Sequence, residues 1–248
     1  MSSFCLPLEL DKEDFSAKVV VIVEEDSSNS NFALASLLWK AVNTNDSGIL
    51  LLALHYPAHH YGHVANKLGF KLIPLVDSGR LIGLDPKKQI FDLLVKNNVG
   101  AKDLMNDLKP LYLSISEGLQ KLKQSHKSVF IFIDDISDLI NAGASLSSVI
   151  AFTHYLRALV SPGITLIMGT HCNENDQEQL QLKNRLILGA DIILTVAGLK
   201  TGISADVTGS IELIKKCCDS LRQFTKDRLF HYKATDRTIR IFSPGTLI

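Results

Sequence analysis

Nearly uninterrupted apolar runs alternate with amphipathic stretches along most of the chain. Such runs are typical of strands buried on both faces of a sheet. They cover residues 19–23, 49–54, 129–133, 164–168 and 192–196, and a further run at residues 72–76 is predicted to form the third strand. The apolar spacing between the runs predicts helices over residues 32–42, 64–68, 109–123, 146–159 and 179–188. Ser145 is placed to cap one of these helices and Gly69 to end another.

This order of elements predicts an α/β fold. Strands that alternate with helices form a mostly parallel sheet with right-handed crossovers and helices on both faces. The last fifty residues differ, because short β patterns at residues 210–215, 229–234 and 238–242 follow one another with only turns between them. We expect these strands to extend the sheet in antiparallel fashion. With no repeat and no long linker, residues 1–248 are predicted to form a single domain.

Composition excludes several classes of protein. The chain has 26 Lys+Arg and 26 Asp+Glu, so it lacks the strongly basic character of a free-standing nucleic-acid-binding protein. Its four cysteines have no paired spacing, which disfavours a secreted disulfide framework and a cysteine zinc site. The longest apolar run is far shorter than a membrane span. We therefore expect a soluble intracellular protein with no membrane partner.

The segments after the first and fourth of these strands predict where a ligand would bind, because ligands of open α/β sheets bind at the carboxyl ends of the strands. A first strand with loop and helix, together with a later apolar strand that ends in Asp134 and Asp135, is the layout of a RecA-like P-loop nucleotide hydrolase. The phosphate loop of that fold needs glycines followed by Lys-Ser or Lys-Thr. Residues 24–32 contain neither, and they begin with three carboxylates. Each carboxylate near a phosphate would cost about 1–4 kcal/mol, which is comparable to the whole free energy of millimolar binding. The sequence thus predicts a degenerate phosphate loop.

Other candidate chemistry is weak. Without a bound phosphate, Asp134 and Asp135 are interpreted as capping groups or contacts to a neighbouring chain, with metal binding left open. His59 and His63, in a cluster with His55 and His60, have a zinc-like i, i+4 spacing, but no third ligand is apparent. No Gly-x-Ser-x-Gly elbow is present. We expect no catalytic residue, no cofactor and no resident metal.

Basic residues gather near the C-terminus despite the zero net charge. Residues 211–240 hold eight basic and four acidic side chains, a local balance of 8 − 4 = +4. The polar segment 171–184 is long for a simple connection and is a candidate binding loop. Both features also fit an ordinary solvated face. The candidate RNA contacts are Lys183, Arg185, Lys215, Lys216, Arg222, Lys226 and Arg228.

Several short blocks, taken in order, resemble the family of the sixth subunit of the Elongator complex. They are Ile133-Asp134-Asp135 with Phe152-x-His154-Tyr155-x-Arg157-Ala158, then Gly198-Leu199-x-Thr201-Gly202 with Asp206-Val207-x-Gly209, and finally Tyr232-Lys233 through Phe242-x-Pro244-Gly245. His60-Tyr61 and Lys67-Leu68-Gly69 also fit the family pattern.

The resemblance spans essentially the whole chain and implies a RecA-like subunit without a phosphate loop. Such a subunit forms a hexameric ring with Elongator subunits four and five, and the ring handles tRNA for wobble-uridine modification. The resemblance also suggests ATP-dependent behaviour of the assembled ring. We expect a non-catalytic subunit that contacts tRNA and the other Elongator subunits in the cytoplasm, with the nucleus as a second location. The alternative is a divergent nucleotide hydrolase whose magnesium is held by Asp134 or Asp135.

Overall fold

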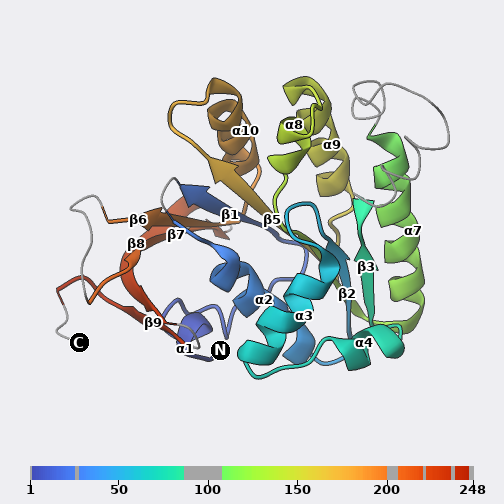
Figure 1. The fold of residues 1–248 in the computed structure, drawn as a ribbon, viewed down its shortest axis with the longest axis horizontal. Helices are drawn as coiled ribbons and strands as arrows, with labels where there is room; N and C mark the ends of the chain where they lie inside the picture. Colours follow the sequence, from blue (N-terminus) through green and yellow to red (C-terminus); the bar gives the residue numbers. More distant parts are fainter. Residues whose placement is uncertain are drawn as a thin grey trace.

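The computed structural model describes residues 2–25, 28–86, 108–199, 206–219, 222–235 and 238–245. Its strands form one sheet in the order β3-β2-β4-β5-β1-β6-β7-β8-β9 (Figure 1). The strands are β1 (Val19–Glu25), β2 (Ser47–Leu52), β3 (Leu81–Leu84), β4 (Ser128–Ile133), β5 (Ile164–Cys172), β6 (Ile192–Gly198), β7 (Gly209–Asp219), β8 (Arg222–Ala234) and β9 (Ile239–Phe242).

The direction of the strands confirms the prediction of a mostly parallel sheet with an antiparallel extension. Strands β3, β2, β4, β5, β1 and β6 pair in parallel. The last three strands then pair antiparallel, first β7 with β6, then β8 with β7, and β9 with β8. The apolar runs explain the parallel part, since consecutive residues of a strand point to opposite faces and both faces here are covered.

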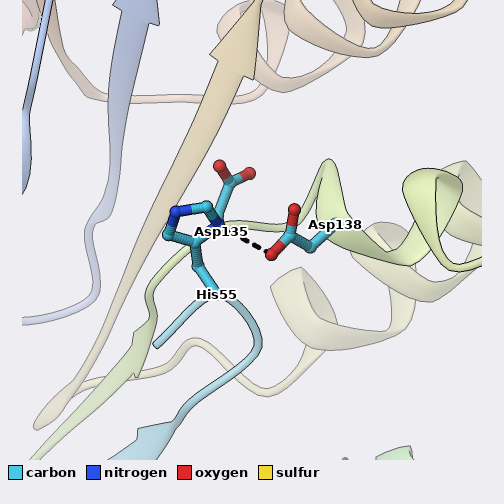
Figure 2. A group of neighbouring side chains, drawn as sticks. All are labelled: His55, Asp135 and Asp138. Carbon is cyan, nitrogen blue, oxygen red and sulfur yellow. Dashed lines mark hydrogen bonds and ion pairs between the residues drawn. The ribbon is translucent and has the colours of Figure 1, made fainter. Parts of the chain in front are cut away.

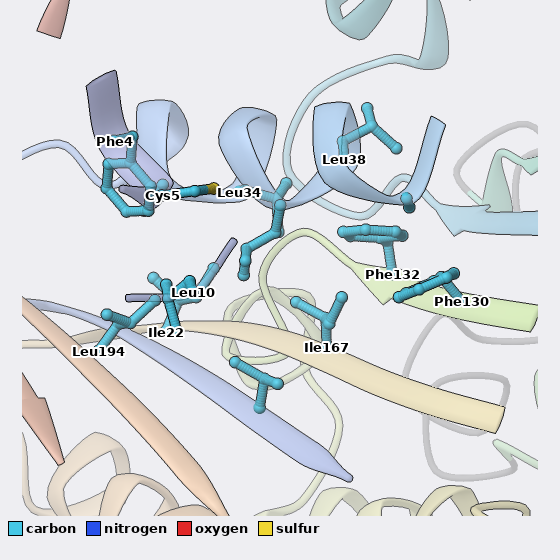
Figure 3. Packing of buried hydrophobic residues seen from close by; sticks show 14 of the residues in the cluster. Phe4, Cys5, Leu10, Ile22, Leu34, Leu38, Phe130, Phe132, Ile167 and Leu194 are labelled. Atoms are coloured by element: carbon cyan, nitrogen blue, oxygen red, sulfur yellow. The ribbon is translucent and has the colours of Figure 1, made fainter. Parts of the chain in front are cut away.

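Helices cover both faces of the sheet, as the sequence predicts (Figure 1). They are α1 (Ser2–Cys5), α2 (Asn31–Asn43), α3 (Ala58–Lys67), α4 (Ile73–Asp77), α7 (Lys109–Ser125), α8 (Asp138–Asn141), α9 (Leu146–Ala158) and α10 (Gln177–Leu188). On one face α1, α2 and α3 pack against strand residues such as Ile22 and Phe132 (Figure 3). On the other face α7 to α10 pack against residues such as Val21 and Ile131. None of the helices in the described ranges has the length and apolar character needed to cross a lipid bilayer.

Two capping predictions are confirmed. The Ser145 hydroxyl accepts a hydrogen bond from the backbone N–H of Ser148 at the start of α9. Gly69 follows the end of α3 with a φ of +84°, a left-handed conformation that glycine adopts without strain. The sequence pattern therefore located these helix ends from local chemistry alone.

The predicted strand at residues 72–76 is wrong. These residues lie in and next to helix α4, and the third strand is β3, which pairs with β2. Pro74 lies in the first turn of α4, where its missing N–H costs nothing, whereas a paired strand would lose a ladder bond there. Ile73 and Val76 are 66% and 52% exposed, so this apolar run does not mark a buried strand.

Candidate functional site at the carboxyl ends of the strands

The carboxyl ends of β1, β4 and β5 bring the predicted site residues together. Glu24 near the end of β1 is in register with His171 of β5. Asp134 and Asp135 follow β4. Strand β5 lies between β4 and β1 and pairs with both. The helix α2 starts close by, because the backbone N–H of Ser30, its N-cap residue, donates to the Glu24 carboxylate. This is the place where an α/β sheet of this kind binds its ligand.

The start of α2 is occupied by a carboxylate of the chain itself. Glu24 Oε2 accepts a hydrogen bond from the Ser30 N–H at 2.6 Å, and Glu24 Oε1 lies 3.6 Å from Nδ1 of His171. A helix N-terminus favours an anion, so this carboxylate takes the position that a phosphate would need. Next to it, Glu25 Oε1 pairs with Lys183 Nζ at 2.9 Å. Asp26, the third acidic residue of the loop, lies outside the described residues.

Asp134 holds the loop after β2 in place. Its two carboxylate oxygens accept five hydrogen bonds. The donors are the backbone N–H groups of Leu54, His55, Tyr56 and Asp135 and the hydroxyl of Tyr61, at 2.6 to 3.1 Å. Burial raises the pKa of Asp134, and the hydrogen bonds from Tyr61 and the backbone act in the opposite direction. The carboxylate thus ties the end of β4 to the β2–α3 connection.

Asp135 has a different environment. Its Oδ1 accepts hydrogen bonds from the backbone N–H of Ser137 at 2.9 Å, from the Ser137 hydroxyl, and from the backbone N–H of His171 at 3.3 Å. The pKa of Asp135 is raised to about 6. Burial is the main cause and the nearby Asp138 carboxylate acts in the same direction, whereas the Ser137 hydrogen bond acts against them. The two adjacent aspartates therefore have separate roles, which a reading of the sequence as an Asp pair did not distinguish.

A third acidic residue, Asp138, joins the site through His55. The His55 Nδ1 lies 2.8 Å from Asp138 Oδ2, and ligand atoms of His55, Asp135 and Asp138 all lie within 4.8 Å of one another (Figure 2). The sequence interpretation saw no acidic third ligand near His59 and His63, and it did not foresee that Asp138 would contact His55, another member of the histidine cluster. The only local signal was Asp138 itself, three residues after Asp135, where an acidic side chain also suits the first turn of α8.

The other three histidines of the cluster lie on α3. His59 and His63 approach each other with ring centroids 6.0 Å apart, and His60 stacks on Tyr56 at 4.1 Å. Burial lowers the pKa of His60, helped by the neighbouring histidines. Within the described residues, His59, His60 and His63 belong to no group of three potential metal ligands.

The cavity at this site is small and polar. It is lined by residues that include Glu24, Ser30, His55, Asp135 and Thr170, and its volume is about 20 Å³. A water molecule needs roughly 10–15 Å³ measured in this way. The cavity therefore has room for a water or a single ion and not for a nucleotide.

The predicted RNA-contact residues lie around the β7–β8 hairpin and α10, and several are engaged within the chain. Lys215 Nζ pairs with Glu13 at 2.9 Å and Arg228 pairs with Glu9 at 2.9 Å, both on the side of the N-terminal segment. Lys216 points to the other face and donates to the backbone carbonyls of Ile187 and Leu188 at the end of α10. Lys183 pairs with Glu25, and Arg185 is exposed on α10. The side chains of the last two candidates, Arg222 and Lys226, lie outside the described residues.

Comparison with known proteins agrees with the resemblance. The model of the Elongation complex protein 6 family matches residues 5–236. Elongator complex protein 6 of Xenopus laevis is 29% identical over 212 residues, which are 79% of this chain and 80% of that protein. The Drosophila melanogaster protein of the same name is 26% identical over 237 residues, covering 92% and 91% of the two chains, and the human one is 26% identical over 213 residues, covering 79% and 80%. Since the family model matches nearly the whole sequence, the chain belongs to the Elongation complex protein 6 family.

Proposed function

We propose that the chain is a non-catalytic structural subunit of the Elongator complex. In this proposal it is a single RecA-like domain over residues 1–248, and it forms a heterohexameric ring with Elongator subunits four and five. The ring binds tRNA and supports modification of the wobble uridine, in the cytoplasm and also in the nucleus. Family membership and the mostly parallel sheet support this proposal.

The observation that carries the non-catalytic part is the Glu24 carboxylate at the start of α2. A triphosphate bound there would have to displace a hydrogen-bonded anion, and the adjacent cavity of about 20 Å³ is too small for it. Asp134, the strand-end residue suited to magnesium, already accepts five hydrogen bonds. We therefore expect no nucleotide hydrolysis at this sheet edge, in contrast to the alternative of a divergent hydrolase.

Calorimetry and native mass spectrometry test these statements directly. The isolated chain should show no low-micromolar binding of Mg·ATP in calorimetry, and such binding would overturn the non-catalytic assignment. Mixed with Elongator subunits four and five, it should form one stable assembly whose mass contains all three proteins. A chain that stays monomeric in that mixture would contradict the structural role.

The tRNA contribution is tested best at Arg185, which is exposed on α10. We expect Arg185→Glu to weaken tRNA binding by the assembled ring. The slope of the logarithm of the affinity against the logarithm of the salt concentration should also become smaller by about one. Lys71→Glu is the matched control, because Lys71 is exposed on the segment between α3 and α4, away from the hairpin and α10. Equal affinities for the two variants would remove Arg185 from the contact set.

A further inference from the structure

We propose that His55, Asp135 and Asp138 form a binding site for a divalent transition-metal ion of the zinc class. This site differs from the expectation drawn from the sequence, which foresaw no resident metal. It is also independent of the proposed Elongator function. The ion would take one imidazole nitrogen and two carboxylate oxygens, with water completing its coordination.

The geometry of the three side chains supports the proposal. Their ligand atoms lie within 4.8 Å of one another, and His55 Nδ1 is 2.8 Å from Asp138 Oδ2 (Figure 2). A tetrahedral zinc ion with ligands at about 2.1 Å holds them roughly 3.4 Å apart. Small side-chain adjustments would therefore bring all three onto one ion. His55 lies in the segment after β2, and Asp135 and Asp138 lie after β4 and at the start of α8, so the fold and not a local motif assembles the set.

The surrounding hydrogen bonds hold each ligand in place. The backbone N–H of His55 donates to Asp134, and the Asn141 side-chain amide donates to Asp138 Oδ1, which leaves Oδ2 toward His55. Asp135 is held through Oδ1 by Ser137 and by the N–H of His171. Supporting bonds of this kind fix the orientation of metal ligands and raise metal affinity.

The donor set selects the class of ion. Magnesium and calcium prefer oxygen ligands, whereas an imidazole together with carboxylates suits zinc, manganese, iron or cobalt. The site is open to solvent through His55, whose side chain is 46% exposed, so an ion can enter. The polar cavity that His55 and Asp135 line has room for one water as a further ligand. The simpler alternative, a hydrogen bond between His55 and Asp138 alone, predicts no metal affinity.

Cobalt and zinc are suitable probes for the full-length chain after treatment with a chelator and removal of that chelator. We expect one equivalent of Co²⁺ to produce visible d–d absorption, and one equivalent of Zn²⁺ to abolish it by competition. We also expect zinc to raise the melting temperature. His55→Ala and Asp138→Asn should each weaken zinc binding by more than about 10- to 100-fold, the loss that follows when only a supporting partner of a metal ligand is removed.

The double variant His59→Ala/His63→Ala is the control, because it removes the exposed histidine pair on α3 and leaves the proposed ligands intact. It should bind one zinc with the affinity of the unaltered chain. Retained binding in His55→Ala, loss in the α3 double variant, or no saturable binding at all would each overturn the proposal. If Asp138→Asn fails to fold, His55→Ala still decides, since the His55 side chain is exposed and circular dichroism can verify the fold of that variant.

Discussion

The carboxylate of Glu24 accepts a hydrogen bond from the backbone N–H of Ser30, so an acidic side chain of β1 caps the start of α2. The Ser30 side chain itself makes no capping bond. The Glu24 carboxylate thus supplies the anion that a helix start favours, and its hydrogen bond contributes to the stability of α2.

Replacing Glu24 should therefore destabilise the fold. We expect Glu24→Ala to lower the free energy of unfolding by about 1 kcal/mol, the usual cost of losing a helix N-cap. Urea titration followed by circular dichroism measures the difference. Glu117→Ala, which removes an exposed carboxylate from α7, should stay within about 0.5 kcal/mol of the unaltered chain. A Glu24 variant as stable as this control would show that the cap contributes nothing.

The hydroxyl of buried Tyr61 donates to Asp134 Oδ2 at 2.7 Å, and its removal tests the role of Asp134 as a structural acceptor. We expect Tyr61→Phe to cost about 1.5–3 kcal/mol of unfolding free energy, the range for a hydrogen bond to a charged group. Tyr155→Phe serves as the control, because Tyr155 is 62% exposed. Indistinguishable unfolding curves for the two variants would contradict this role of Asp134.

The sheet could be predicted from the sequence because each buried strand is a continuous apolar run that can be recognised locally. A run such as residues 19–23 is apolar at every position, which is typical of a strand covered on both faces. The run at residues 72–76 has nearly the same composition but packs as an exposed helix. Pro74 distinguishes the two cases, because proline suits the first turn of a helix and would interrupt the hydrogen-bond ladder of a sheet.

The site could be predicted only in part. The missing glycines and the acidic loop predict a degenerate phosphate loop, but the partners of Asp134 come from the β2–α3 connection about eighty residues earlier in the chain. No local pattern reports such contacts. The basic residues illustrate the same limit, because adjacent Lys215 and Lys216 point to opposite faces of β7 and contact different parts of the chain.

Substitution of Gly169, in β5, tests how closely β5 approaches the end of β4. A Cβ atom at Gly169 would lie 2.0 Å from the backbone oxygen of Asp134, and a backbone atom cannot move aside cheaply. We expect Gly169→Ala to cost about 3 kcal/mol, at the upper end of the usual range for overpacking. Thermal and urea unfolding measure the loss.

The matched control for Gly169 is Gly62, which lies inside α3 with open space around the added methyl group. Gly62→Ala should raise the free energy of unfolding by about 0.5–1 kcal/mol, because alanine loses less backbone entropy in a helix than glycine does. The two Gly→Ala changes should thus have opposite signs. A neutral Gly169→Ala would mean that β5 and the end of β4 are further apart than the structure has them.

Asp135 should make the stability of the metal-free chain depend on pH. Its pKa is about 6 in the folded protein against an ordinary value of 3.8 for an exposed aspartate, so between these values the folded state holds a proton that the unfolded state has lost. The free energy of unfolding from this group is therefore highest below about pH 4, falls as pH rises to about 6, and is constant above that. A shift of this size corresponds to at most about 3 kcal/mol.

Asp135→Asn isolates this contribution, because the amide stays neutral and its oxygen can still accept the bonds from Ser137 and His171. The stability of the variant minus that of the unaltered chain should rise between about pH 4 and pH 6 and then level off. Urea titrations with EDTA present measure it, and taking the difference cancels the other titrating groups. Asp77→Asn, which removes an exposed carboxylate at the end of α4, controls for the loss of a negative charge. A difference that is flat with pH, or one that falls, would mean that the Asp135 carboxylate is not disfavoured by its surroundings.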